Sequence, residues 1–197
     1  MPVSVGLKNI HIAKLLTDEK GTGTTYEKPE YFAPALSVTV TPNSSSATLY
    51  ADDGPDEVGT TISGIEVSIN VKDLTSEQQA LLLGNKIDAN GAVISRTTDE
   101  APYVAIGYEI TRNDGKSHYV WLYKGMFREN EATHNTKGES IEFQTPTLSA
   151  NFIKRNSDEA WKYTLRSNEA TANPVAVANF FKQVMEEADT AMTAPTV

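Results

Sequence analysis

The chain contains no cysteine among its 197 residues. That absence excludes a disulfide framework, a thiolate nucleophile and a cysteine-based zinc site. Long apolar runs are also missing: no stretch reaches the ~18 residues of a membrane-spanning helix. The first residues lack the basic and apolar regions of a signal peptide. We therefore expect a protein that is made and folds in the cytoplasm.

Basic residues are scarce relative to acidic ones. There are 17 Lys and Arg against 26 Asp and Glu, a net charge of −9. Tight binding to a phosphate backbone depends on Lys and Arg displacing counterions, so this balance argues against a nucleic-acid-binding protein. The hydrophobic share of 39% is ordinary for a globular chain, and the length fits one domain.

Groups suited to catalysis are few. The imidazoles are His11, His118 and His134, and no two of them have the spacing of a metal-binding helix. No serine lies in a nucleophile-elbow sequence. The acidic run at 52–57 lacks the spacing of a calcium loop, and we interpret it as a solvated loop. We expect no catalytic residue, no metal and no cofactor.

Period-two alternation dominates the first half of the chain. It predicts a first strand from Val3 to Ile12, with a register change, and a second strand at 36–41. A turn is expected at 42–46, followed by a third strand at 47–50. Residues 65–72 alternate perfectly between β-branched and polar side chains, which predicts a half-buried strand.

The longest hydrophobic segment, 103–129, is predicted to be a β-hairpin. Its two halves are rich in Val, Ile, Tyr and Trp and meet at the turn sequence 113–116. Gly107 and Gly125 indicate bulges or close approach of the backbone to a neighbour. Further strand character appears at 141–144, 148–153 and 161–165.

Two helices are predicted. At 75–83, Thr75 and Gln78 form a capping-box pattern, Leu81 to Leu83 are expected to be buried, and Gly84 ends the helix. A second, amphipathic helix is predicted at 174–188, beginning at Pro174.

The fold class that follows is mainly β (α+β), an antiparallel sandwich or open barrel with flanking helices. Residues 1–189 are expected to form one domain and 190–197 a flexible tail. Residues 17–31 show no period and are interpreted as a structureless loop, which suggests an arm for a partner.

The hairpin aromatics leave two interpretations open. They form either a packed interior and subunit interface, or a platform that stacks on sugars, so a carbohydrate-binding β-sandwich is the alternative function. The aromatics concerned are Tyr103, Tyr108, Tyr119, Trp121, Tyr123 and Phe127. Glu66 and Glu109 could pair on one sheet face as in glycosidases, which is the hydrolytic alternative.

Three stretches carry a resemblance to a known family: LTSEQQALLLG at 74–84, the hairpin sequence at 103–129, and KGESIEFQTPTLSANFIKR at 137–155. Together they resemble the major tail proteins of long-tailed bacteriophages, of the phi13 type. The likeness extends from the first strand to the strand around Trp161.

The resemblance implies a structural, non-enzymatic virion protein of the tail, made in the host bacterial cytoplasm. Its copies would form hexameric rings that stack into a hollow tube and conduct DNA. Other tail proteins, such as the tape measure and the tail terminator, would be partners, with DNA only in passage and no membrane. An acidic wall would keep DNA mobile, because like charges repel.

Candidate residues follow from this resemblance. Side chains proposed to face the channel are Glu66, Ser68, Asn70, Lys72, Glu109 and Thr111. Side chains proposed for assembly are Thr17, Asp18, Glu19, Lys20, Tyr26 and Tyr31. Residues 1–6, loop 17–31 and tail 190–197 are expected to be poorly packed in the monomer and ordered in the tube.

Overall fold

The computed structural model describes residues 2–51, 54–129 and 145–187. Eleven strands and two short helices are found in these ranges. The strands are β1 (Ser4–Glu19), β2 (Gly23–Tyr26), β3 (Glu30–Tyr31), β4 (Ala35–Ala51), β5 (Gly54–Val71), β6 (Lys86–Ile87), β7 (Val93–Ile94), β8 (Tyr103–Arg112), β9 (Ser117–Arg128), β10 (Thr147–Ile153) and β11 (Lys162–Arg166). The helices are α1 (Ser76–Leu83) and α2 (Pro174–Asn179).

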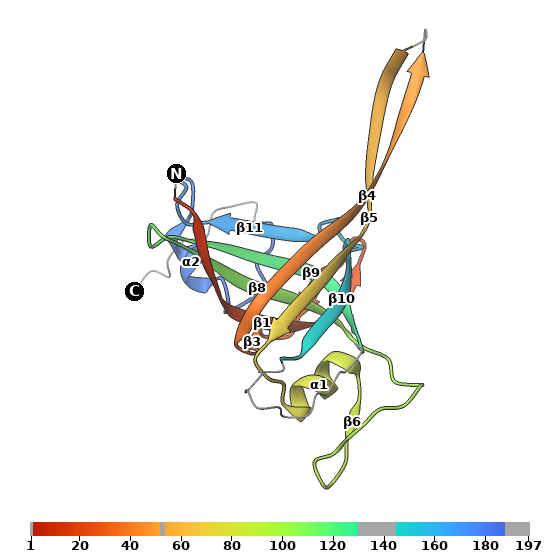
Figure 1. The fold of residues 1–197 in the computed structure, drawn as a ribbon, viewed down its shortest axis with the longest axis vertical. Coiled ribbons are helices and arrows are strands. Elements are labelled where there is room, and N and C mark those ends of the chain that lie inside the picture. The colour runs from red at the N-terminus through yellow and green to blue at the C-terminus, as the bar shows by residue number, and fades with distance from the viewer. Residues whose placement is uncertain (1, 52–53, 130–144, 188–197) are drawn as a thin grey trace, which may run out of the picture.

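One antiparallel sheet organises the molecule, with strand order β2-β1-β8-β9-β10-β5-β4. Strand β3 pairs with β1, and β11 pairs with the part of β9 that β10 leaves unpaired. The sheet curls until β1 approaches β4 (Figure 1). Within the described residues, β4 pairs only with β5, so the barrel stays open. The predicted mainly β, antiparallel fold is confirmed.

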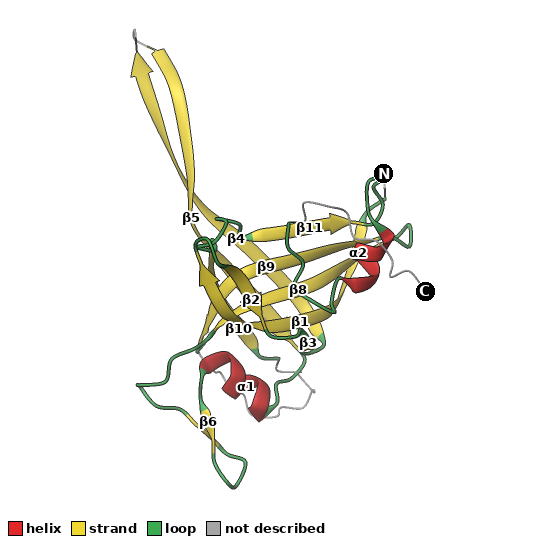
Figure 2. Cartoon of the chain, turned by 180° about the vertical axis from the view of Figure 1, so that it is seen from behind, coloured by secondary structure: helices red, strands yellow, loops and turns green. Residues whose placement is uncertain are grey.

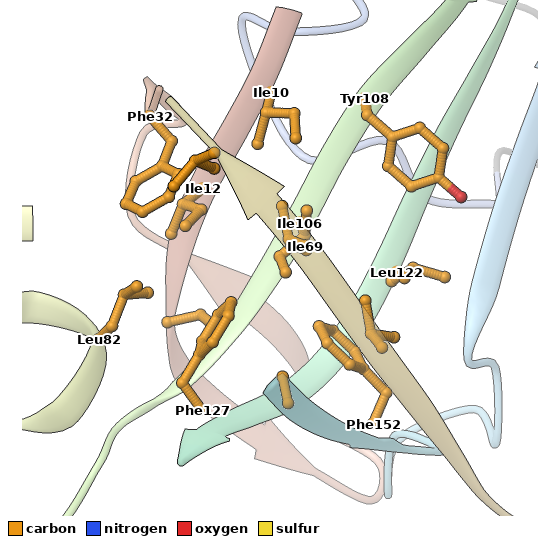
Figure 3. Packing of buried hydrophobic residues seen from close by; sticks show 14 of the residues in the cluster. Ile10, Ile12, Phe32, Ile69, Leu82, Ile106, Tyr108, Leu122, Phe127 and Phe152 are labelled. Atoms are coloured by element: carbon orange, nitrogen blue, oxygen red, sulfur yellow. The ribbon is translucent and has the colours of Figure 1, made fainter. Parts of the chain in front are cut away.

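The main core fills the inside of the curled sheet. Ile65, Val67, Ile69 and Val71 are all buried on one side of β5, which confirms the alternation seen in the sequence. Figure 3 shows residues from β1, β8, β9 and β10 converging on the same interior, with Leu82 of α1 at its edge. Burying each such side chain contributes about 1.5 to 3 kcal/mol.

The predicted hairpin is β8–β9, and its turn lies at 113–116, with Gly115 at a φ of 74°. A Cβ on Gly107 would lie 2.8 Å from the indole ring of Trp121. A Cβ on Gly125 would overlap the Phe152 ring. Both glycines therefore let an aromatic ring lie against the backbone, as the sequence indicated.

A second apolar cluster lies on the opposite side of the sheet, under the C-terminal segment 174–187. Phe180, Val184 and Met185 from this segment pack on Trp121 and Tyr123 of β9. The predicted helix at 174–188 is wrong beyond Asn179. There, the Trp121 Nε1 donates to the Phe180 carbonyl and the Tyr123 hydroxyl to the Met185 carbonyl. These two backbone carbonyls thus accept hydrogen bonds from side chains of β9, and the helix does not continue.

The capping box of α1 is present, with Gly84 in the left-handed conformation at its end. Leu81 was expected to be buried, but it is 42% exposed, whereas Leu82 lies in the core and Leu83 packs against it.

The predicted turn at 42–46 is wrong, because β4 runs without interruption from Ala35 to Ala51. Proline is tolerated at position 42 since β4 is an edge strand, where a missing N–H breaks no ladder. The chain reverses instead between Ala51 and Gly54.

The interpretation of 17–31 as a structureless loop is also wrong. β1 continues to Glu19, and β2 and β3 both pair back onto it. Gly21 and Gly23, with φ near 90°, allow the tight turn. Residues 2–6 are exposed yet anchored: Asn113 and Val3 exchange hydrogen bonds, and Ser4 and Gly6 pair with β8. The predicted strand 141–144, His134 and the tail 190–197 lie outside the described residues.

Candidate functional site

The described part of the chain contains no group of three or more acidic or histidine side chains placed to hold a metal ion. His11 stacks on Phe181 at a ring distance of 4.4 Å, and His118 lies between Arg112 and Asn168. None of the described helices is long and apolar enough to cross a membrane.

Glu66 and Glu109 do not meet. Glu66 is exposed on β5, whereas β8, which carries Glu109, is separated from β5 by β9 and β10. Glu109 is only 5% exposed and accepts hydrogen bonds from Asn9 Nδ2 at 2.7 Å and Ser117 Oγ at 2.6 Å. Lys8 completes the group at 3.2 Å. Glu109 is therefore a structural carboxylate, and the pair required by the hydrolytic alternative is not formed.

The hairpin aromatics do not form an open platform. Trp121, Tyr123, Phe127 and Tyr108 are each at most 7% exposed, Tyr119 is half-buried, and Tyr103 is 38% exposed. Burial raises the pKa of the Tyr108 hydroxyl to about 12. The surface on which the carbohydrate-binding alternative depends is therefore missing from the hairpin.

A continuous polar face covers the outer side of β4, β5 and β10. Glu66, Ser68 and Asn70 alternate with the buried residues of β5. Strand register aligns them with neighbours on β10 (Thr147, Ser149, Asn151) and β4 (Ser37, Thr39, Thr41). Of these aligned side chains only Glu66 is charged. Lys72 is exposed just past the end of β5, while Thr111 lies on β8 beside Gly6, away from this face.

The most prominent feature is a two-stranded arm formed by the distal halves of β4 and β5. The pairing from Ser44 with Ile62 to Ala51 with Gly54 carries it far beyond the body of the protein (Figures 1 and 2). Its large apolar side chains are exposed: Leu49 by 58%, Tyr50 by 70%, Val58 by 66% and Ile62 by 49%. Residues 29–71 contain no Lys, Arg or His, and four of their carboxylates lie within 52–57. We call residues 44–62 the arm.

Sequence reasoning missed the arm because residues 42–46 were interpreted as a turn. One signal in the chain points to it. Ser and Thr recur on both sides of the sequence Asp52 to Pro55, which places turn chemistry midway between two β-compatible stretches.

The proposed assembly residues of 17–31 divide into exposed and buried ones. Thr17, Glu19, Lys20 and Tyr31 are exposed. The Tyr26 hydroxyl donates to the Tyr123 carbonyl at 3.1 Å, and burial raises the pKa of that hydroxyl.

Asp18 is buried inside the subunit. Its carboxylate accepts from Lys124 Nζ at 2.6 Å and from the backbone N–H groups of Asn156 at 2.8 Å and Ser157 at 3.0 Å. Burial acts to raise the pKa of Asp18, but these hydrogen bonds outweigh it, and the net effect is a lowered pKa.

The Arg155 guanidinium binds Glu186, near the end of the C-terminal segment 174–187. Arg155 is 2% exposed, binds Asp158 and Glu186, and lies 3.8 Å above the Tyr123 ring. It links the loop after β10, strand β9 and the C-terminal segment.

Comparison with known proteins bears on what these surfaces are for. No match was found among curated proteins. The family model described as phage tail tube protein matches residues 38–188, a span that includes the arm, the C-terminal segment and, apart from Ser37, the polar face. Since this match covers most of the chain, the protein belongs to the phage tail tube protein family.

Proposed function

We propose that copies of this chain assemble into hexameric rings that stack into the hollow tube of a phage tail and conduct DNA through it. Membership of the family supports a structural subunit of the tail. The hexameric ring, the stacking and the passage of DNA are the proposal. Other tail components, such as the tape measure and the tail terminator, would contact the ends or the interior of the tube, and the subunit would be made in the host cytoplasm.

The observation that carries the proposal is the arm. A two-stranded ribbon is marginally stable in water by itself, and its outer edges present unpaired backbone groups. This one also exposes Leu49, Tyr50, Val58 and Ile62 to solvent. Exposed apolar residues on such a ribbon are typical of a surface that another protein covers. In an assembly of identical subunits, a neighbouring copy can cover the exposed apolar residues of each arm.

The polar face of β4, β5 and β10 is the best candidate for the channel wall. Its Ser, Thr and Asn side chains carry no charge, and Glu66 adds weak repulsion. Arg128 of β9, paired with Ser149, lies at the border of this face. Glu109 is omitted because it is buried, and Thr111 because it lies on a different part of the sheet. The proposed wall is thus sparsely charged rather than densely acidic, and Lys72 marks its edge.

Shortening the arm tests the proposal. Residues 45–61 are replaced by Asn-Gly, a sequence suited to a two-residue hairpin between the paired positions Ser44 and Ile62. We expect the variant to keep the near-ultraviolet signal of buried Trp121 but to sediment as a single small species when concentrated. The unmodified chain should form large particles under the same conditions. Equal assembly of both proteins would contradict a role for the arm.

A further inference from the structure

The curled sheet leaves a seam between its two ends. On β1, residues Ser4 to Lys8 pair with β8, and on β4, residues Ser37 to Val40 pair with β5. Within the described residues, the opposite edges of these two segments pair with nothing and face each other. Between them lies a groove of about 460 Å³, lined by Leu7, Leu36, Val38, Val40, Tyr108 and Ile110. We call this groove the seam.

The seam is mostly apolar, although Ser37 also lines it, and none of its lining residues is charged. Leu36 is 59% exposed there, although its strand neighbours Val38 and Val40 pack partly against the core. A free strand edge on each side of an apolar floor suits an added β-strand, which would pair its backbone with an edge and bury side chains below.

The two faces of the arm differ. Strand register puts Tyr50 opposite Pro55, Thr48 opposite Val58 and Ser44 opposite Ile62, all on one face. None of the paired residues on that face is charged, and three of them, Tyr50, Val58 and Ile62, are large, apolar and exposed. Asp56 lies at the register shift between Glu57 and Pro55 and has no paired residue across the ribbon. The other face pairs Leu49 with Glu57, Ala47 with Gly59 and Ser45 with Thr61. We call these the uncharged face and the Glu57 face.

We propose that the uncharged face of the arm of one copy docks in the seam of a second copy. The inference rests on the proposed function and names the surface that receives the arm. The residues that line the seam and the paired residues of the uncharged face carry no charge, so burying them together removes none of their charges from water. Both also have free strand edges, so backbone hydrogen bonds can form across the contact.

The arm of one copy cannot dock in the seam of the same copy. The arm continues β4, which borders the seam, together with β5, and leads away from the body, as Figures 1 and 2 show. The contact therefore joins two different patches on two copies. Head-to-tail contacts of this kind generate closed rings or open stacks, because each new copy brings both a free arm and a free seam.

The absence of cysteine makes a direct test straightforward. Single variants Leu36→Cys in the seam and Val58→Cys or Ile62→Cys on the uncharged face are mixed pairwise and treated with a short bismaleimide. Ala47→Cys and Ser45→Cys, exposed on the Glu57 face, are the matched controls. We expect Leu36→Cys to form cross-linked dimers with the uncharged-face variants at a yield roughly tenfold above that with the controls.

The mixtures are also imaged by electron microscopy. Equal yields on both faces, or no cross-link between position 36 and either uncharged-face position in samples that contain tubes, would overturn the docking and leave the proposed function standing. Cross-linked dimers without tubes under any condition would support the docking while contradicting the tube. Absence of both would overturn both.

Discussion

Asp18 and Lys124 form a buried ion pair, with 2.6 Å between Oδ2 and Nζ and side chains only 4% and 8% exposed. The pair joins the far end of β1 to β9. Two backbone N–H groups after β10 bind the same carboxylate. Asp18, in a segment that the sequence predicted to be a structureless loop, is thus held against β9 and the loop after β10.

Replacing Asp18 by Asn should destabilise the subunit strongly. Lys124 would be left buried without its counter-charge, and breaking such a pair typically costs about 3 to 5 kcal/mol. Urea unfolding followed by Trp fluorescence measures the loss. Glu19→Gln, at the exposed neighbouring position, should change stability by less than about 0.5 kcal/mol. Similar midpoints for the two variants would argue against the role assigned to the pair.

Stability should also fall in acid. The pKa values of Asp18 and Asp158 are both lowered in the folded protein, by hydrogen bonds that outweigh the opposing effect of burial. Their stabilisation is therefore fully present above the ordinary pKa of about 4 and is lost as pH falls through the lower folded values. Urea midpoints measured from pH 7 to pH 3 should drop most at the acid end. The drop should be smaller in Asp18→Asn, and an equal drop would exclude Asp18 as a source.

Gly107→Ala should destabilise the hairpin by overpacking. The new methyl group would lie 2.8 Å from the Trp121 ring, which is itself fully buried and cannot move aside freely. Overpacking of this kind costs about 1 to 3 kcal/mol. Gly59→Ala on the arm is the control, because a Cβ there meets nothing within 4 Å. A neutral effect at position 107 would show that the indole has room to shift.

Phe180→Ala should loosen the C-terminal segment. Phe180 is fully buried and contacts the rings of Trp121, Tyr119 and Tyr163. A large-to-small change at such a site costs about 3 to 5 kcal/mol. The variant should bind a hydrophobic dye and be cut faster by protease near residue 180. Gln183→Ala, exposed in the same segment, should behave like the unmodified protein.

Sequence patterns correctly predicted those elements that are determined by residues close to one another in the chain. The alternation of Ile65 to Val71, the capping box of Thr75 and Gln78, and the turn at Gly115 are each encoded within a few residues. Gly107 and Gly125 were identified as sites of close approach, although only the structure names the rings that use them.

The misplaced elements depend on partners far along the chain. Asp18 and Lys124 are 106 positions apart, and nothing local distinguishes Asp18 from a solvated carboxylate. The last helix ends at Asn179, and Trp121 and Tyr123 donate to the carbonyls of Phe180 and Met185 that follow it. Pro42 reads as a turn residue unless β4 is known to be an edge strand, and that is a property of the whole sheet.

A cryo-electron microscopy reconstruction of the concentrated protein would test the central claim most directly. The account predicts a hollow tube of stacked six-membered rings, with Glu66, Ser68 and Asn70 facing the channel and every arm packed against another copy. A solitary subunit at all concentrations, or a tube with these side chains on its outer surface and arms free in solvent, would contradict it.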